Sequence, residues 1–196
     1  EVGEVRRGAI RLDEIIAPVG VNAGFECGGN RPSVFQGLIG NARWGGTPLR
    51  DILLEAGIRP EGIEVVFYGA DKGTESIRDT EAEQNFGRSM HYTDAMQPDI
   101  MLAYEMNGEP LNLYHGAPLR VLVPGWYGVA SVKWLRTMRV TDQPYQGYFQ
   151  TTKYSIIRGG RRQPLGPGSV KSELLSPAPG AEVGAGTVRI AGVAWA

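Results

Sequence analysis

A single cysteine carries the first chemical signal in this sequence. Cys27 lies in the segment FECGGNRP, between an apolar, strand-like stretch and a turn rich in glycine, asparagine and proline. Two glycines beside the thiol let the backbone fold closely around whatever the sulfur binds, and Arg31 would favour the thiolate. A thiolate is a soft ligand, suited to a heavy transition metal. The motif alone also fits a small buried hydrophobic residue, which is the commoner role of a lone cysteine.

Direct binding of zinc or an iron-sulfur cluster is disfavoured by the supply of ligands. The chain has one cysteine and two histidines, His91 and His115, which are too few at any recognised spacing. A metal at Cys27 would therefore take most of its ligands from an organic cofactor, which the protein holds by its phosphate and polar edges.

A second group of chemically useful residues lies in the segment 113–135, LYHGAPLRVLVPGWYGVASVKWL. It places His115, Arg120 and Lys133 at the ends or edges of two expected strands, around the glycine turn 125–128. Backbone N–H groups of such a turn and three basic side chains can together bind a phosphate. The plainer alternative is that these are solvated strand and turn residues.

Tyr154 is a third candidate, in the segment YFQTTKYSIIRGGRR. A tyrosine near several arginines can donate a hydrogen bond to an oxo group or to an anionic substrate. A half-buried core tyrosine is the commoner alternative.

The elements that must position these residues include one helix, over 47–57. Thr47 is expected to cap it, Pro48 suits its first turn and Gly57 can end it. Its apolar face contains Leu49, Ile52, Leu53 and Ala56.

Strands are predicted from short apolar or alternating runs that end in turn residues. The predicted strands are 63–68, 101–106, 119–123 and 132–140, and Asn107-Gly108 indicates a hairpin after the second.

Two polar stretches are predicted to lack regular structure. The charged, weakly periodic stretch 69–88 reads as a long surface loop with at most one helical turn. Residues 158–169, RGGRRQPLGPGS, have the composition of a linker, and short β-like runs follow it. That tail is too short for an independent β-domain, so it either packs on the main body or begins a second domain.

Composition limits the class of protein. The chain has 196 residues, 42% hydrophobic and 21% charged, which predicts one main globular domain. With 28 glycines and 13 prolines, a β-rich or mixed fold is favoured over a helical bundle. A net charge of −1 gives no general reason to expect nucleic acid or an anionic membrane as partner. No apolar run is long enough to span a bilayer, and the first ten residues lack a secretory signal.

Together these segments resemble the molybdopterin-binding domain of the sulfite oxidase family, over residues 10–154. FECGGNR resembles the cysteine loop of that family, and AYEMNGEPLNLYHGAPLRVLVPGWYGVASVKWL resembles its longest signature. The resemblance implies an α+β fold of the mixed, β-rich sulfite oxidase type. It also implies a catalytic domain at 1–163, followed at 164–196 by a linker and the partial start of an immunoglobulin-like dimerisation domain.

The resemblance assigns a role to each candidate residue. Cys27 is expected to ligate molybdenum, while Arg31 and Tyr154 act on the substrate and the transferring oxygen. The residues expected to hold the pterin and its phosphate are His115, Arg120, Ser131, Lys133 and Asp71.

The implied activity is that of a molybdenum-molybdopterin (Mo-MPT) oxidoreductase, which transfers an oxygen atom to sulfite or a related sulfur oxyanion. Pro32 stands where many sulfite oxidases have a second arginine, so sulfite is not the sole substrate implied. The sequence shows no haem-binding domain, so electrons are expected to leave to a separate acceptor such as a c-type cytochrome. A homodimer and a periplasmic location are also expected. Because the chain begins at Glu1 and not at a methionine, a leader or N-terminal segment is expected outside it.

Two other functions fit the sequence. The same cofactor could act in reverse as a sulfoxide reductase, a reading that the CGGNR and VPGWYG segments favour less. Alternatively, the chain could be a cofactor-free, β-rich binding module in which Cys27 is buried and inert. Metal content separates the module from the enzyme, and substrate assays separate the two enzymes.

Overall fold

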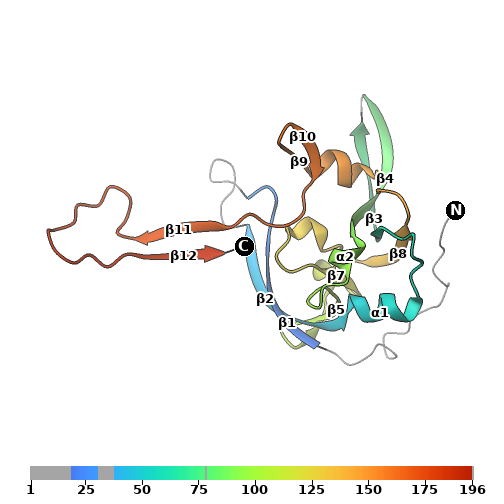
Figure 1. Cartoon of the computed structure of the whole chain (residues 1–196), viewed down its shortest axis with the longest axis horizontal. Coiled ribbons are helices and arrows are strands. Elements are labelled where there is room, and N and C mark those ends of the chain that lie inside the picture. The colour runs from blue at the N-terminus through green and yellow to red at the C-terminus, as the bar shows by residue number, and fades with distance from the viewer. Residues whose placement is uncertain (1–18, 31–37, 78, 196) are drawn as a thin grey trace.

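Two antiparallel sheets form the body of the molecule (Figure 1). The computed structural model describes residues 19–30, 38–77 and 79–195. The larger sheet contains β1 (Val19–Glu26), β2 (Ile39–Pro48), β5 (Met101–Met106) and β6 (Glu109–Pro110) in that order, and β7 (Arg120–Leu122) also pairs with β5. The smaller sheet has the order β4 (Thr80–His91), β3 (Glu64–Ile77) and β8 (Leu135–Thr141).

The main hydrophobic core joins these two sheets to the helix α1 (Leu49–Ala56). Its buried side chains come from both sheets and from the helix, and they include Leu49, Leu53, Val65, Phe67, Leu102, Val121 and Val140. A second cluster is built on β1, β2, β5 and β7, and it includes Ala23, Trp44, Met101 and Leu122. Alternate residues of β5 and β7 enter different clusters, so these central strands are covered on both faces. The predicted α+β, β-rich fold is confirmed.

The remaining elements are short. They are the helix α2 (Tyr92–Ala95), the 3-10 turns η2 (Leu113–His115) and η3 (Gly128–Ala130), the π-helical η4 (Phe149–Lys153), and the strands β9 (Ser155–Arg158), β10 (Arg161–Pro164), β11 (Lys171–Ser176) and β12 (Ala191–Trp195). Within the described parts of the chain, no helix is long and apolar enough to cross a membrane.

The predicted helix is present, but its start differs from the expectation. Thr47 is fully buried within β2 and does not cap the helix, which begins directly after Pro48 without a side-chain cap. Gly57 ends the helix with φ 72°, and its N–H donates to the carbonyls of Leu53 and Leu54. Pairing with β5 therefore keeps Thr47 extended, and this tertiary contact overrides the capping preference of threonine.

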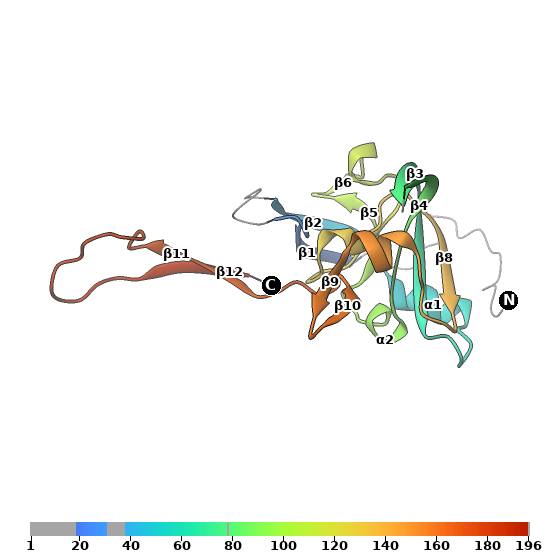
Figure 2. The same cartoon turned by 90° about the horizontal axis from the view of Figure 1, so that it is seen from above.

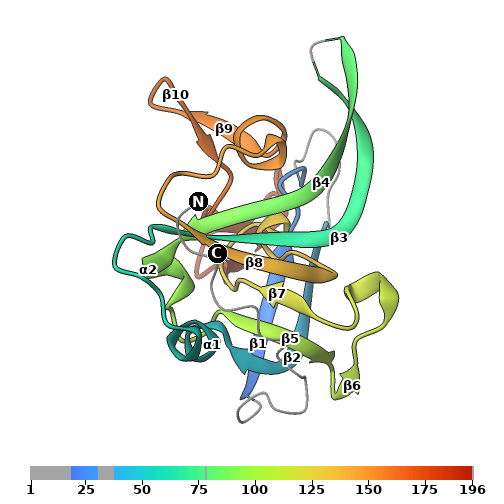
Figure 3. The ribbon, with the colours of Figure 1, turned by 90° about the vertical axis from the view of Figure 1, so that its right-hand side faces the viewer.

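The prediction of a surface loop at 69–88 is wrong. Most of this stretch forms a two-stranded arm, because β3 continues to Ile77 and pairs with β4 from Thr80 onward. The partner β8 covers β3 only up to Gly69, so the outer part of the arm rises away from the body (Figure 3). Both faces of that outer part are largely exposed, so it lacks the apolar alternation by which a half-buried strand is recognised.

Most of the other predicted strands are confirmed. The strand 101–106 matches β5, and Asn107 and Gly108 adopt φ 55° and 85° in the hairpin turn. The strand 119–123 contains β7, and β3 begins at Glu64 within the predicted 63–68. The strand predicted at 132–140 begins only at Leu135, so Lys133 lies in the segment that leads into β8.

The stretch 158–169 is not a plain linker. Its first half pairs β9 with β10 in a hairpin whose turn, Gly159-Gly160, has positive φ at both positions. After it, β11 and β12 pair with each other in a second hairpin that projects from the body (Figures 1 and 2). An immunoglobulin-like start and a domain division between 163 and 164 stay predictions.

Candidate functional site

The loop after β1 presents the sulfur of Cys27. The Cys27 N–H donates to the Leu38 carbonyl at 3.0 Å, and its own carbonyl accepts from the Asn30 N–H at 2.9 Å. The Gly29 N–H points at Sγ, 3.4 Å away. Cys27 is exposed, so the buried, inert role is disfavoured. The backbone thus holds a thiol that is open to a ligand, with the Gly29 amide beside its sulfur.

Arg120 on β7 is the centre of the predicted basic cluster. Its side chain is buried, and its two terminal nitrogens donate to the carbonyls of His115 and Ser131, each at 3.0 Å. Its guanidinium carbon lies 5.2 Å from the centroid of the Phe25 ring. Phe25 is two residues before Cys27, so this contact places the cluster next to the cysteine loop. Burial lowers the pKa of Arg120 to about 10, which leaves it charged at neutral pH.

Lys133 adds a second cation to this cluster. Its Nζ donates to the Tyr114 carbonyl at 2.9 Å and lies 4.2 Å from the centroid of the Trp134 ring. Burial lowers the pKa of Lys133, the charge of Arg120 lowers it further, and Asp71 acts in the opposite direction. Two neighbouring cations of this kind favour an anionic ligand.

His115 completes the basic group at the end of η2. Its Nδ1 is 2.9 Å from the Asn112 side-chain oxygen, which fixes the ring. Gly116 follows with φ 101°, and a Cβ there would press on the side chain of Lys133. The glycine therefore allows His115 and Lys133 to lie close together, as the sequence predicts.

Ser131 and the glycine turn 125–128 serve the protein's own backbone in this structure. The Ser131 hydroxyl accepts the Val123 N–H at 3.0 Å. The N–H groups of Trp126 and Tyr127 donate to protein carbonyls, so they are not available to an anion as the sequence suggested. The contact of Ser131 with a cofactor stays a prediction, whereas its hold on Arg120 is direct.

Asp71 supplies an acceptor whose partner is missing. Its Oδ1 is buried and has no hydrogen-bond partner among the described residues. A Cβ on Gly69 would meet both Asp71 Oδ1 and the Lys133 carbonyl, so Asp71 lies beside the basic cluster. A buried, unpartnered acceptor is costly unless a ligand satisfies it, and a pterin carries N–H donors. The residues present therefore fit a phosphorylated pterin, with cations for its phosphate and an acceptor for its ring.

Tyr154 directly follows η4. Its ring packs on Phe149 and Phe86 at centroid separations of 6.3 Å and 6.5 Å. Its carbonyl accepts the Leu165 N–H at 2.9 Å, and the Leu165 side chain contacts Gly28. Leu165 thus links the backbone of Tyr154 to the residue that follows Cys27. Arg31 and Pro32 lie outside the described residues.

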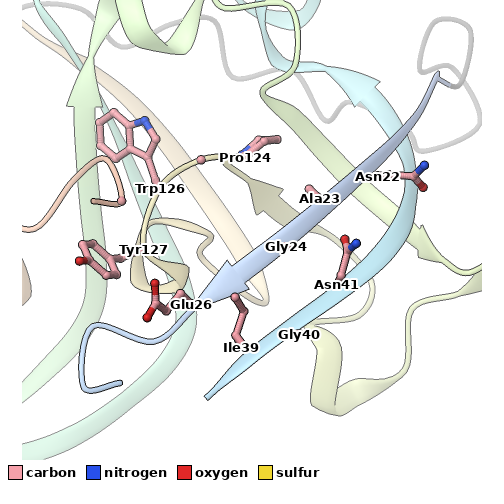
Figure 4. A pocket seen from close by; sticks show the side chains of 12 residues that line it. Asn22, Ala23, Gly24, Glu26, Ile39, Gly40, Asn41, Pro124, Trp126 and Tyr127 are labelled. Carbon is pink, nitrogen blue, oxygen red and sulfur yellow. The ribbon is translucent and has the colours of Figure 1, made fainter. Parts of the chain in front are cut away.

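An open groove of about 520 Å³ begins next to this loop, between the β1–β2 ribbon and the turn 124–127 (Figure 4). Its walls include Asn22, Glu26, Asn41, Trp126 and Tyr127. Within the described parts of the chain, no three His, Cys, Asp or Glu side chains gather in a metal-binding group. The sequence predicts that a metal at Cys27 would take most of its ligands from a cofactor, and this arrangement is compatible with that prediction.

Comparison with known proteins identifies the family. Residues 3–149 match the model of the oxidoreductase molybdopterin-binding domain. The chain belongs to the sulfite oxidase family. It is 34% identical to the mitochondrial sulfite oxidase of Drosophila melanogaster over 89% of this chain and 34% of that protein. It is 38% identical to the sulfite oxidase of Arabidopsis thaliana over 70% of this chain and 39% of that protein.

A solved structure shares this fold. The sulfane dehydrogenase SoxCD of Paracoccus pantotrophus superposes with a TM-score of 0.68 at 32% identity, over 91% of this chain and 47% of that chain. This chain therefore spans less than half the length of the compared relatives. The family match confirms the predicted molybdopterin-binding domain and its molybdenum-molybdopterin cofactor, and it disfavours a cofactor-free binding module.

Sequence reasoning missed Arg88, which the sulfite oxidase-type fold buries completely. Its Nη1 donates to the carbonyls of Phe149 and Tyr154 at 2.7 Å and 3.3 Å, and its Nη2 donates to the Leu165 carbonyl. Burial lowers the pKa of Arg88 to about 10. Because residues 69–88 were interpreted as a surface loop, no pattern indicated a buried cation there. The apolar Phe86 two residues earlier was the available signal that this stretch returns to the core.

Proposed function

We propose that this chain is the cofactor-binding catalytic domain of a molybdenum oxidoreductase that transfers an oxygen atom to sulfite or a related sulfur oxyanion. One observation carries the proposal: the exposed Cys27 directly follows β1, two residues after Phe25, and the buried Arg120 guanidinium packs on the Phe25 ring. A soft metal ligand and an anion-binding cluster are thereby adjacent.

The choice of substrate is supported by the relatives. Two of them are sulfite oxidases and the third is a sulfane dehydrogenase, so each acts on a reduced sulfur compound. Sulfite and water give sulfate, two protons and two electrons. When bound, the molybdenum cofactor supplies the oxygen-atom transfer and accepts the electrons.

The residues of this chain would divide the work between holding the cofactor and handling the substrate. Cys27 would ligate the metal through its thiolate, and Arg120 and Lys133 would hold the phosphate end of the pterin. Asp71 Oδ1 would accept an N–H of the pterin ring, which would satisfy its buried lone pair.

On the substrate side, Tyr154 would donate a hydrogen bond to the oxygen that is transferred. Arg31 would neutralise the oxyanion. Such preorganised donors stabilise charge that develops during reaction.

We further propose that the electrons leave to a c-type cytochrome, that the enzyme works in the periplasm, and that it forms a homodimer through the C-terminal region. These proposals rest on the family resemblance. The projecting β11–β12 hairpin supports the last, because it exposes apolar side chains such as Leu174, Leu175 and Val193.

Metal analysis and substrate assays test the proposal. Protein purified from a host that makes the cofactor should contain about one molybdenum per chain, and Cys27→Ser should give a largely inactive site, since oxygen is a harder ligand than sulfur. Steady-state turnover of sulfite with an electron acceptor should be faster than turnover of methionine sulfoxide with an electron donor. Absence of molybdenum from the wild type would contradict the proposal that the chain is a molybdenum enzyme. Faster sulfoxide reduction would instead support the sulfoxide reductase alternative.

A further inference from the structure

A short segment after β10, residues 165–171, packs along the cysteine loop and the neighbouring turn; we call it the strap. Trp126 and Pro167 form an antiparallel bridge. On either side of that bridge, the Tyr127 N–H donates to the Gly166 carbonyl at 3.1 Å and the Gly168 N–H donates to the Gly125 carbonyl at 2.8 Å. The strap is therefore tied by its backbone to the body, although its composition suggested a linker.

The first residue of the strap touches one side of the cysteine loop. Leu165 is 8% exposed, and its side chain lies so close to Gly28 that a Cβ on Gly28 would overlap Leu165 Cδ2. The Leu165 backbone is fixed at both ends, because its N–H donates to Tyr154 and its carbonyl accepts from the buried Arg88. A buried apolar side chain on a hydrogen-bonded backbone thus lies against the residue that follows Cys27.

The last residue of the strap touches the other side of the loop. Lys171 forms an ion pair with Glu26, and their side chains are 31% and 10% exposed. Glu26 Oε1, which accepts from the Lys171 ammonium, also accepts from the Asn30 side-chain N–H at 2.6 Å. Figure 4 shows the Glu26 side chain at the end of β1, with Tyr127 close by, and the Lys171 ammonium lies 5.9 Å from the Tyr127 ring centroid.

We propose that the strap positions the sulfur of Cys27, with Leu165 and Lys171 as positioning residues. A metal ligand works only when neighbouring groups hold it close to its productive geometry. Lys171 fixes Glu26, which directly precedes Cys27, and through Glu26 it also fixes Asn30. Leu165 fixes Gly28 from the other side. The inference rests on the proposed role of Cys27 as the metal ligand.

Amide hydrogen exchange on the full chain tests Lys171. Lys171→Met should speed exchange at the amides of Cys27, Asn30 and Leu38 by about fivefold to tenfold, the loss expected for a partly buried charged hydrogen bond. Lys171→Arg should restore slow exchange because it keeps the charge.

The matched control is Lys72→Met, which breaks the Lys72–Glu83 pair on the exposed arm, 57% and 64% exposed at its two side chains. It should leave all three amides unchanged. Equal exchange in the Lys171→Met and Lys72→Met proteins would overturn the strap's role.

A double-variant cycle tests Leu165. Gly28→Ala should loosen the loop by its clash with Leu165, and adding Leu165→Ala should return exchange toward the wild-type rate because the added methyl then has room. Additive effects of the two changes would contradict the contact.

Exchange and molybdenum content separate this inference from the proposed function. One outcome is that Lys171→Met speeds exchange in the loop while the wild-type protein contains no molybdenum. The strap would then remain a structural element, but Cys27 would not be a metal ligand. The opposite outcome is a wild type that contains molybdenum, with loop exchange rates that change with neither Lys171 nor Leu165. That result would overturn the role of the strap and leave the proposed function standing.

Discussion

Two buried arginines organise the two halves of the site, and they differ in what surrounds them. Arg120 packs against the neighbouring aromatic rings of Phe25 and Trp44 and lies beside a second cation, Lys133. Arg88 donates to three carbonyls of the segment that carries Tyr154 and Leu165, and the groups that act on its charge are Tyr154 and Tyr145. Burial lowers both pKa values to about 10.

The comparison separates a binding role from a structural one. The charge of Arg120 lies beside another cation, and two neighbouring cations favour an anionic ligand. The charge of Arg88 is spread over three backbone carbonyls, and of these the Tyr154 carbonyl also accepts the Leu165 N–H. We therefore expect loss of Arg88 to act first on folding and loss of Arg120 to act first on cofactor binding.

Removal of Arg88 should give the largest change in stability. Arg88→Met leaves the carbonyls of Phe149, Tyr154 and Leu165 without this donor, which we expect to lower the free energy of unfolding by about 3 kcal/mol or more. Denaturant titration measures it. Arg139→Met, at an exposed position of β8, serves as the control and should change stability by less than about 0.5 kcal/mol. A small effect at Arg88 would remove the distinction between the two arginines.

Removal of Arg120 should lower stability less than removal of Arg88 does, and it should weaken cofactor binding more. Arg120→Met loses two hydrogen bonds to carbonyls but keeps an apolar contact with the aromatic rings, so we expect a loss of about 2 kcal/mol. Molybdenum retained after dialysis should fall at least about tenfold, because a charge-assisted contact to the phosphate is lost. Full molybdenum retention in a folded Arg120→Met protein would show that this arginine is structural, as Arg88 is.

Lys133 should affect binding with almost no effect on folding. Its Nζ makes one hydrogen bond near the surface, so Lys133→Met should change the free energy of unfolding by less than about 1 kcal/mol. Molybdenum retention should fall about tenfold, whereas the matched variant Lys72→Met should retain molybdenum as the wild type does. Equal retention in both lysine variants would contradict a phosphate contact at Lys133.

The smallest expected effect is a change in pH dependence. Because burial and Arg120 lower the pKa of Lys133, its positive charge is present below that pKa and is lost as pH rises through it. Anion binding should therefore weaken at a lower pH than for an ordinary lysine. Asp71 counters the shift, so Asp71→Asn should move this loss to still lower pH. Phosphate affinity of the cofactor-free protein, measured across the alkaline range, provides the readout, and an unchanged profile would separate Asp71 from Lys133.

The part of the site that the sequence predicted depends on local patterns. The cysteine loop and the segment 115–133 are each a short, continuous stretch of sequence. Glycines within each stretch indicate close backbone approaches. The strand 101–106 and its Asn-Gly turn were predictable for the same reason, since a buried strand and a primed turn each have a local signature.

The part that was not predicted depends on contacts distant in sequence. Arg88 meets its acceptors more than sixty residues along the chain, and Lys171 meets Glu26 across 145 residues. The arm formed by β3 and β4 is exposed on both faces, so its strands carry polar residues at nearly every position. Neither long-range pairing nor a two-sided exposed strand leaves a periodic pattern in a single sequence.

X-ray absorption at the molybdenum edge tests the central claim most directly. We predict about three sulfur ligands around the metal in the wild type, from one pterin dithiolene and Cys27, and about two in Cys27→Ser. The same number of sulfur ligands in both proteins would show that Cys27 does not bind the metal, and it would contradict the account of this site.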